Sequence, residues 1–193
     1  MAKLLWLLSV ALTAIVIGTA SAIYASQTLK PTGMVRIGPW EAVRAVGDAA
    51  DDPYSHAYIA ASGQLPPGSA EGMRFVATNT SDGSAIRPDC FVTLSGEVEF
   101  ARLWTLSITE PDGSPLNAPT AASLHSQDLV YSREGGFELG IGPRPFAPNT
   151  MLVNNDGPVA LVLHVYEVAL NAAPDSGASA MPQVSQGTDG RGC

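Results

Sequence analysis

The residues whose types support catalysis or metal binding are few and widely spaced along the chain. The three histidines, His56, His125 and His164, form no pair at the i,i+2 or i,i+4 spacing of a compact metal site. No Gly-x-Ser-x-Gly stretch provides the sharp turn that exposes a nucleophilic serine. His125 is followed by Ser126, but adjacency in sequence does not give the geometry of a catalytic triad. The sequence therefore predicts no catalytic residue, no metal site and no cofactor.

Two pairs of carboxylates are the remaining candidates for acid–base chemistry. Asp51 and Asp52 directly precede Pro53, where an aspartate typically caps the start of a helix. Glu97 and Glu99 alternate along a predicted strand edge or turn, where both side chains face solvent. A glycosidase needs two carboxyl groups held about 5–9.5 Å apart across a cleft. Spacing along the chain does not establish that arrangement for either pair.

The chain is acidic, with 18 acidic and 10 basic residues and a formal net charge of −8. Lys3 is the only charged residue before Lys30, so the acidic excess belongs to the part of the chain beyond the N-terminal segment. Such a surface repels phosphate backbones and anionic lipid headgroups. We therefore expect no nucleic-acid partner.

The two cysteines, Cys90 and Cys193, lie far apart in the sequence. Cys90 precedes Phe91 and Val92, which is typical of a half-buried thiol. Cys193 ends a segment that lacks large apolar groups, so we do not expect a structural disulfide between the two.

The N-terminal segment is long and apolar enough to cross a membrane. From Leu4 to Ala25 it carries no charge, and its length is close to the roughly 20 residues that span a bilayer core. One interpretation is an uncleaved anchor, and the other is a signal peptide that is cleaved near Ala20-Ser21-Ala22. The anchor is favoured because the apolar stretch exceeds a usual signal-peptide core. Both place the following domain in the periplasm, either anchored to the inner membrane or secreted.

The central part of the chain alternates between short apolar strands and turn residues. Six segments have strand character: Met73–Thr78, Cys90–Leu94, Arg102–Thr109, Phe137–Ile141, Met151–Val153 and Val159–Val168. In the third, Trp104, Leu106 and Ile108 share one face. The last is almost continuously apolar and β-branched, as expected of a central strand. The pattern predicts a mainly β fold, an antiparallel β-sandwich or jelly-roll-like domain with one or two short helices, behind a single transmembrane helix.

These features divide the chain into four parts. Residues 1–25 form the anchor or signal segment, 26–38 a linker, 39–170 the β domain and 171–193 a disordered tail of small and polar residues. Within the domain, Asp52 and Pro53 begin a short helix that ends near Gly63, and a Pro-Pro-Gly turn follows. The weak pattern between Ala118 and Val130 is compatible with another short helix.

Three stretches resemble a bacterial family of domains of unknown function, numbered 1214. They are DPYSHAYIAASGQLPPGSAEG (52–72), LWTLSITEPDGSPLNAP (103–119) and the late strand that ends in VYEV. The resemblance implies a β-sandwich domain in an envelope protein with an N-terminal hydrophobic segment. It also implies a companion protein of the related family 1254, and no established activity. His56 and His164 stand where the family pattern has arginine.

The family-like segment supplies the best candidates for a ligand-binding or partner-binding site. We select Asp52, Tyr54, His56 and Glu71 from it, and we add Trp104 and Arg144. The leading hypothesis is a non-enzymatic, membrane-anchored envelope protein whose β domain binds a partner subunit or ligand. A carbohydrate ligand follows only by analogy with other jelly rolls. The alternative is a periplasmic hydrolase or carbohydrate-modifying enzyme with His56 and Glu71 as acid–base groups.

Overall fold

The computed structural model describes residues 2–28, 34–43, 53–62, 71–98, 101–116, 123–166 and 181–187. The chain separates into two compact units. The first contains Met1–Thr32 and Ala49–Leu65, and the second contains Gly33–Asp48 and Pro66–Cys193. The second unit holds every described strand, so the predicted mainly β fold is confirmed.

The first unit is helical. Helix α1 spans Ala2–Thr28, and α2 spans Pro53–Ser62, so the predicted short helix is confirmed at both ends. Within α1, residues Ala2–Ala25 form a helix long and apolar enough to cross a membrane, with none of that stretch buried. Leucine, isoleucine and valine side chains are exposed all around α1, as expected of a segment that meets lipid on every side. The predicted helix cap, Asp52, lies outside the described residues.

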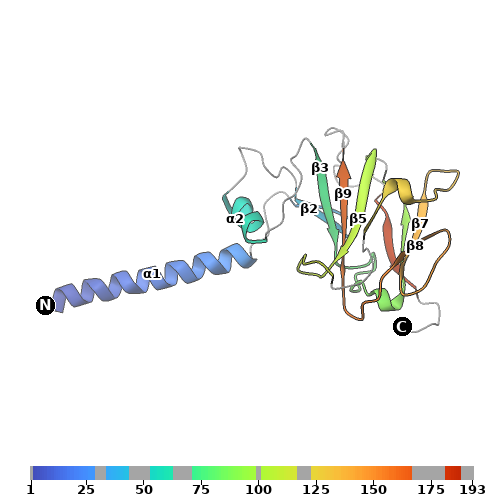
Figure 1. Ribbon diagram of the computed structural model, residues 1–193. Helices are drawn as coiled ribbons and strands as arrows, with labels where there is room; N and C mark the ends of the chain where they lie inside the picture. Colours follow the sequence, from blue (N-terminus) through green and yellow to red (C-terminus); the bar gives the residue numbers. More distant parts are fainter. Residues whose placement is uncertain are drawn as a thin grey trace. The chain divides into compact units, whose positions relative to one another are not determined.

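The β unit contains two sheets (Figure 1). The larger has six strands in the order β1-β2-β3-β9-β5-β6, and all neighbouring strands are antiparallel. Its strands are β1 (Met34–Ile37), β2 (Trp40–Val43), β3 (Gly72–Ala77), β5 (Leu103–Thr109), β6 (Ser123–His125) and β9 (Ala160–Tyr166). Strand β9 lies between β3 and β5, which confirms the prediction that the most apolar segment is a central strand.

The smaller sheet has four strands in the order β10-β4-β7-β8. Its strands are β4 (Val92–Gly96), β7 (Phe137–Gly142), β8 (Asn149–Leu152) and β10 (Gln183–Gln186). Strands β7 and β8 run parallel, and the other pairs are antiparallel. Two short 3-10 helices, η1 (Pro88–Cys90) and η2 (Ser126–Asp128), precede β4 and follow β6.

The two sheets share one hydrophobic core, as in a sandwich. Trp104, Leu106 and Ile108 all lie in it, which confirms that they share the inward face of β5. The four-stranded sheet contributes Leu94 and Leu139 from its two middle strands. Successive side chains of a strand point to opposite faces of the sheet. The polar residues that alternate with these buried residues therefore lie on the outer face.

The prediction of a disordered tail was wrong for residues 181–187. Strand β10 pairs with β4, and Met181 and Val184 are buried in the core. The indole Nε1 of Trp40 donates a hydrogen bond of 2.7 Å to the carbonyl oxygen of Pro182. The C-terminal segment is therefore part of the β unit and supplies one edge of its smaller sheet, while 171–180 and 188–193 lie outside the described residues.

Two other predicted boundaries also differ from the structure. The β unit begins at Gly33 and its first strand at Met34, inside the predicted linker, because β1 pairs with β2. The segment 49–65, which we placed in the β domain, belongs to the unit that contains α1. In the weak region 118–130 the described residues form strand β6 and the 3-10 helix η2 rather than an α-helix.

The expectation that Cys90 is a free thiol was also wrong. Cys90 is disulfide-bonded. The only other cysteine of the chain is Cys193, which lies outside the described residues. A disulfide at Cys90 sits beside the point where β10 ends, since the amide of Gly187 donates to the carbonyl oxygen of Phe91.

Candidate functional site

The six predicted site residues are divided between the two units. His56 is exposed on α2, and the side chain of Tyr54 on the same helix lies outside the described residues, as does Asp52. Glu71 is exposed immediately before β3, in the β unit. Arg144 is exposed in the loop between β7 and β8.

Trp104 is a core residue, with only 3% of its surface exposed. Its ring lies 5.1 Å from the ring of Phe137, centroid to centroid, in a tilted arrangement. Burial of such a ring stabilises the domain, and it leaves Trp104 without the exposed face that a ligand would contact.

The described residues also contain no group of three or more His, Cys, Asp or Glu side chains placed to hold a metal ion. His125 Nε2 lies 3.2 Å from Asp128 Oδ1 on the surface. Both side chains are about half exposed, and an exposed pair of this kind contributes about 0–1 kcal/mol.

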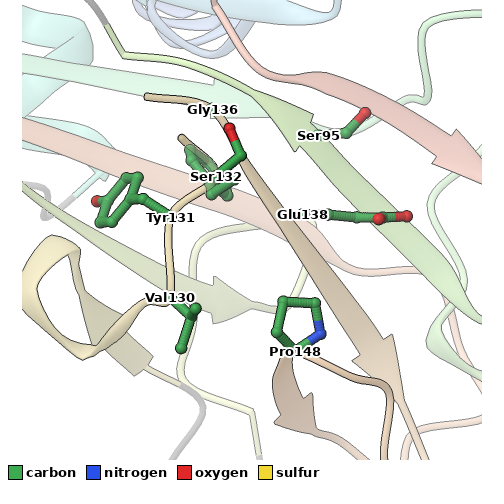
Figure 2. A pocket seen from close by; sticks show the side chains of 8 residues that line it. Ser95, Val130, Tyr131, Ser132, Gly136, Glu138 and Pro148 are labelled. Carbon is green, nitrogen blue, oxygen red and sulfur yellow. The ribbon is translucent and has the colours of Figure 1, made fainter. Parts of the chain in front are cut away.

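A pocket of about 420 Å³ opens on the outer face of the four-stranded sheet (Figure 2). This volume is within the range of about 300–1,000 Å³ typical of small-molecule sites. The lining residues come from β4, β7 and two loops: Ser95, Val130, Tyr131, Ser132, Gly136, Phe137, Glu138 and Pro148. Four of these side chains carry oxygen (Ser95, Tyr131, Ser132 and Glu138), and three contain only carbon and hydrogen beyond the backbone (Val130, Phe137 and Pro148).

The floor of the pocket is a cross-strand pair. Ser95 on β4 and Glu138 on β7 are in register. Leu94 and Leu139, their neighbours along each strand, are completely buried, so Ser95 and Glu138 point away from the core. The register therefore places one hydroxyl and one carboxylate side by side on the floor.

One wall of the pocket is the loop of residues 130–136. The Tyr131 hydroxyl donates a hydrogen bond of 2.8 Å to the carbonyl oxygen of Ser126, and its ring contacts Phe137 edge-on at 6.0 Å. Burial raises the pKa of Tyr131, so the phenol stays a neutral donor at physiological pH. These contacts fix the ring while 41% of the residue remains exposed.

The same loop is closed by a tight turn. The amide of Ser132 donates to the carbonyl oxygen of Gly136 at 2.8 Å, and the amide of Gly135 donates back to Ser132 at 3.2 Å. Gly135 has a φ of 92°, which a residue with a side chain rarely adopts. The turn places Gly136 and Ser132 at the rim of the pocket.

Asn149 connects the loop wall to the floor. This residue is 5% exposed, and its Nδ2 donates hydrogen bonds of 2.9 Å to the carbonyl oxygens of Val130 and Glu138. Its Oδ1 accepts a bond of 2.7 Å from the amide of Val130. Pro148, the neighbour of Asn149, also lines the pocket. One buried amide thus connects the loop, strand β7 and the residue that precedes β8.

The other end of this sheet face is closed by aromatic rings. The rings of Phe91 and Phe146 are in contact, with centroids 5.3 Å apart and planes tilted by 49°. They cover Gly140, where a Cβ atom would lie 2.6 Å from Cζ of Phe91. Glycine is required there because the rings approach the backbone so closely. The hollow is therefore confined to the end of the face near Glu138.

No family model matches this chain, and no curated protein matches it. Among solved structures, it is similar to the VPA0106 protein from Vibrio parahaemolyticus, with a TM-score of 0.61 and 12% sequence identity. That match covers 93% of this chain and 45% of the Vibrio chain, so this chain spans less than half of its length. A putative uncharacterized protein from Burkholderia cenocepacia matches with a TM-score of 0.43 and 12% identity, over 63% of this chain and 31% of that one.

The first similarity supports the fold alone, at this level of identity. It gives no residue role to the pocket or to the six predicted residues. The family-1214 resemblance therefore stays a prediction.

Sequence reasoning missed every residue that lines the pocket. Gly135 and Gly136 belong to the turn at the rim of the pocket. The sequence signal that could have indicated the pocket is the pair Val130-Tyr131 beside that turn. Two large apolar residues next to a polar glycine loop have no sheet face to bury them, so they indicate an exposed apolar surface. Their partners in the pocket, Ser95 and Pro148, are distant in sequence.

Proposed function

We propose that this chain is a membrane-anchored envelope protein whose β domain binds a partner subunit or a ligand without catalysing a reaction. The observation that carries the proposal is helix α1. Its 24-residue apolar stretch, Ala2–Ala25, measures about 36 Å at roughly 1.5 Å per residue, enough to cross a hydrocarbon core of about 30 Å. With all of its large apolar side chains exposed, this helix is stable in lipid rather than in water.

The periplasmic side is the proposed location of the β domain. Structural disulfides persist in oxidising compartments, which include the bacterial periplasm, and are rare in the cytosol. The disulfide at Cys90 supports this placement. Inner-membrane attachment is the corresponding proposal for α1, and cleavage after Ala22 would release the same domain into the periplasm.

A binding role fits the chemistry of the described residues better than a hydrolytic one. Among the described residues that line the pocket, Glu138 is the one carboxylate, and an acid–base pair for glycoside hydrolysis requires two. His56 and Glu71, the residues of the hydrolase alternative, are both exposed. No specific observation favours the enzyme.

The partner that we propose is a companion envelope protein, of the kind that the family-1214 resemblance implies. The similar fold in the Vibrio protein makes up 45% of a longer chain. This is compatible with a domain that works beside another domain, which for this chain would be a separate protein of family 1254.

Membrane attachment is tested by fractionating cells that express the full chain and a variant lacking residues 2–25. We expect the full chain to resist extraction with alkaline carbonate, and protease added to spheroplasts to digest the β domain. A full chain that is recovered in the soluble fraction at its full mass would contradict the anchor. Protection from protease in intact spheroplasts, with digestion after lysis, would contradict the periplasmic location.

Partner binding is tested by affinity purification from native membranes in mild detergent, with mass spectrometry of the intact bait and its co-purifying proteins. A stoichiometric companion supports the subunit role. Bait that is recovered alone argues against a partner subunit and leaves the ligand-binding role of the pocket as the remaining function. The bait mass also decides whether the first twenty-odd residues are retained.

A further inference from the structure

We propose that the disulfide at Cys90 is a redox latch. In the oxidised chain it holds strand β10 in the four-stranded sheet and the ring of Phe91 over β7, and reduction releases both while the rest of the β unit stays folded. The inference goes beyond the proposed function, because it concerns a conformational change within the domain. It follows from three observations where η1, β4 and β10 meet: the disulfide, the hydrogen bonds of β10 and the backbone of Phe91.

The disulfide lies at one end of the β4–β10 pair. Cys90 is disulfide-bonded, and Cys193, the other cysteine of the chain, is therefore its partner. Cys90 ends η1, and the amide of Gly187, directly after β10, donates a bond of 2.9 Å to the carbonyl oxygen of Phe91. Because Cys193 follows Gly187 in the sequence, the disulfide fastens the chain beyond β10 to the start of β4.

Strand β10 buries little apolar surface for its length. Within residues 181–187, the buried ones are Met181, Pro182 and Val184. Fixing the backbone of one residue costs free energy of the same order as burying one apolar side chain contributes. The buried side chains alone therefore do not offset the ordering of the whole segment. A cross-link that closes a loop of about 100 residues removes much of the chain entropy that opposes docking, so the disulfide decides whether β10 stays in the sheet.

The hydrogen bonds of β10 show which amides its release would expose. The amide of Ser81 donates a bond of 2.7 Å to the carbonyl oxygen of Val184, and the amide of Val184 donates one of 3.1 Å to Oγ of Ser81. Val184 therefore directs both of its backbone groups away from β4. Because these groups alternate in direction along a strand, the β4 residues that bond to β10 are Thr93 and Ser95.

Phe91 has a strained backbone that the latch holds in place. Its φ is 49°, which a residue with a side chain rarely adopts. Its amide donates a bond of 3.1 Å to the carbonyl oxygen of Pro88, its carbonyl oxygen accepts the bond from Gly187, and its neighbour Cys90 is cross-linked. Such a conformation persists only where the surroundings fix it. Loss of the disulfide and of β10 removes two of these restraints, so Phe91 returns to an ordinary backbone conformation.

The relaxation of Phe91 uncovers the glycine face of β7. A Cβ atom on Gly140 would lie 2.6 Å from Cζ of Phe91, and one on Gly142 would lie 2.9 Å from its Cδ2. The ring thus fills the space that side chains would occupy on β7. Its release opens an apolar hollow above Gly142, beside the ring of Phe146, that the oxidised protein does not present.

Closing the latch oxidises two thiols. The Sγ atoms of Cys90 and Cys193 form a bond, and two protons and two electrons pass to the disulfide of a thiol-oxidising protein, which becomes a dithiol. Opening is the reverse exchange, with a dithiol protein as the reductant. In the proposed periplasmic location the latch closes after export. This timing rests on the proposed function, whereas the coupling between the disulfide, β10 and Phe91 does not.

The first test compares amide hydrogen exchange, resolved to single residues, in the full chain in detergent with and without a phosphine reductant. We expect reduction to speed exchange at least tenfold in β10 and at the amides of Thr93 and Ser95. The amides of Val92 and Leu94 are the internal control, because they point to β7 and should keep their rates. Cys193→Ser should show the reduced pattern without reductant.

The second test uses the reciprocal effect, since two coupled equilibria bias each other by the same factor. Each variant is equilibrated with reduced and oxidised glutathione, and its oxidised fraction is measured by mass spectrometry after alkylation. Val184→Ala loosens β10, and Gly142→Ala places a Cβ atom against the ring of Phe91, so both should lower the equilibrium constant for disulfide formation at least fivefold. Val165→Ala is the matched control, because Val165 is an equally buried valine in the other sheet and should leave the constant unchanged.

Four results would overturn the inference. The first is an intact mass that shows two free thiols in the chain purified without reductant. The second is equal exchange at Thr93 and Ser95 in both redox states. The third is reduction that also releases the amides of β9, which would make the disulfide a stabiliser of the whole domain rather than a latch. The fourth is an equilibrium constant that Val165→Ala lowers as much as Val184→Ala. None of these results depends on where the protein lies in the cell, so they leave the membrane-fractionation test independent.

Discussion

Replacing Asn149 by aspartate tests how the pocket is held together. The substitution keeps the shape of the side chain and retains an acceptor for the amide of Val130. It removes the two donated bonds of 2.9 Å to the carbonyl oxygens of Val130 and Glu138. In their place a carboxylate oxygen faces two carbonyl oxygens in a site that is 5% exposed.

The size of the effect follows from these contacts. When the new carboxyl is protonated, its single O–H still donates one bond, so one hydrogen bond with a net value of about 0.5–1.5 kcal/mol is lost. Ionisation adds a further cost, because burial and the facing carbonyls raise the folded-state pKa of the new carboxyl above its unfolded value of about 3.9. The unfolded chain then ionises first as pH rises. The stability difference from wild type therefore grows by about 1.4 kcal/mol per pH unit between pH 3.9 and the folded-state pKa.

Urea unfolding followed by the fluorescence of the buried Trp40 and Trp104 measures the effect at pH 4, 5.5 and 7. We expect Asn149→Asp to be destabilised at all three, and by at least about 2 kcal/mol more at pH 7 than at pH 4. Asn154→Asp is the control, since it adds the same charge at an exposed position five residues away. A destabilisation that is equal at pH 4 and pH 7, or that Asn154→Asp reproduces, would refute the assignment of Asn149 as a buried donor.

Three further predictions concern the β unit. Val184→Ala in β10 removes two carbons from a completely buried side chain and should cost about 2 kcal/mol of unfolding free energy, measured by urea titration; no loss would mean that β10 does not pack. Reduction of the Cys90 disulfide with dithiothreitol should lower that free energy by about 2–4 kcal/mol, and an unchanged transition midpoint would contradict a stabilising disulfide. Burial and the nearby Arg74 cation lower the pKa of His164 from 6.5, so the unfolded state binds more protons and wild-type stability falls as pH drops below about 6.5. His164→Gln should reduce this slope between pH 7 and pH 5, and an identical slope would show that His164 does not cause it.

The sequence predicted the elements whose signal is local. Strand β5 alternates apolar and polar residues, and β9 is apolar on both faces because it is a central strand with Leu161 and Val162 both buried. Helix α2 was located by Pro53 at its first position and the residues that follow. In each case the pattern within about ten residues is enough to decide the element.

The elements that were missed depend on distant partners. Strand β10, QVSQ, has one large apolar side chain, and its composition resembles that of the polar segment around it. It becomes a strand because β4 offers it backbone hydrogen bonds and a place in the core for Val184, about 90 residues earlier in the chain. The same long-range pairing explains why a disulfide at Cys90 was not expected. The pocket was missed for the same reason, because strand register brings Ser95 beside Glu138.

Strand β10 also supports the pocket, although none of its residues lines the cavity. Ser95 is in register with Gln183 of β10 on one side and with Glu138 of β7 on the other. Without β10, β4 would become an edge strand, and edge strands are held by hydrogen bonds on one side only. The floor of the pocket would then be less rigid.

This reasoning predicts that Val184→Ala loosens the floor of the pocket, although Val184 does not line the cavity. Val165→Ala is the matched control, because Val165 is also a completely buried valine but lies on β9 in the other sheet. Both variants should lose similar stability, whereas only Val184→Ala should speed the exchange of the β4 backbone amides with solvent, by several-fold, under conditions where both are folded. Equal exchange rates in the two variants would show that the floor of the pocket holds its shape without support from β10.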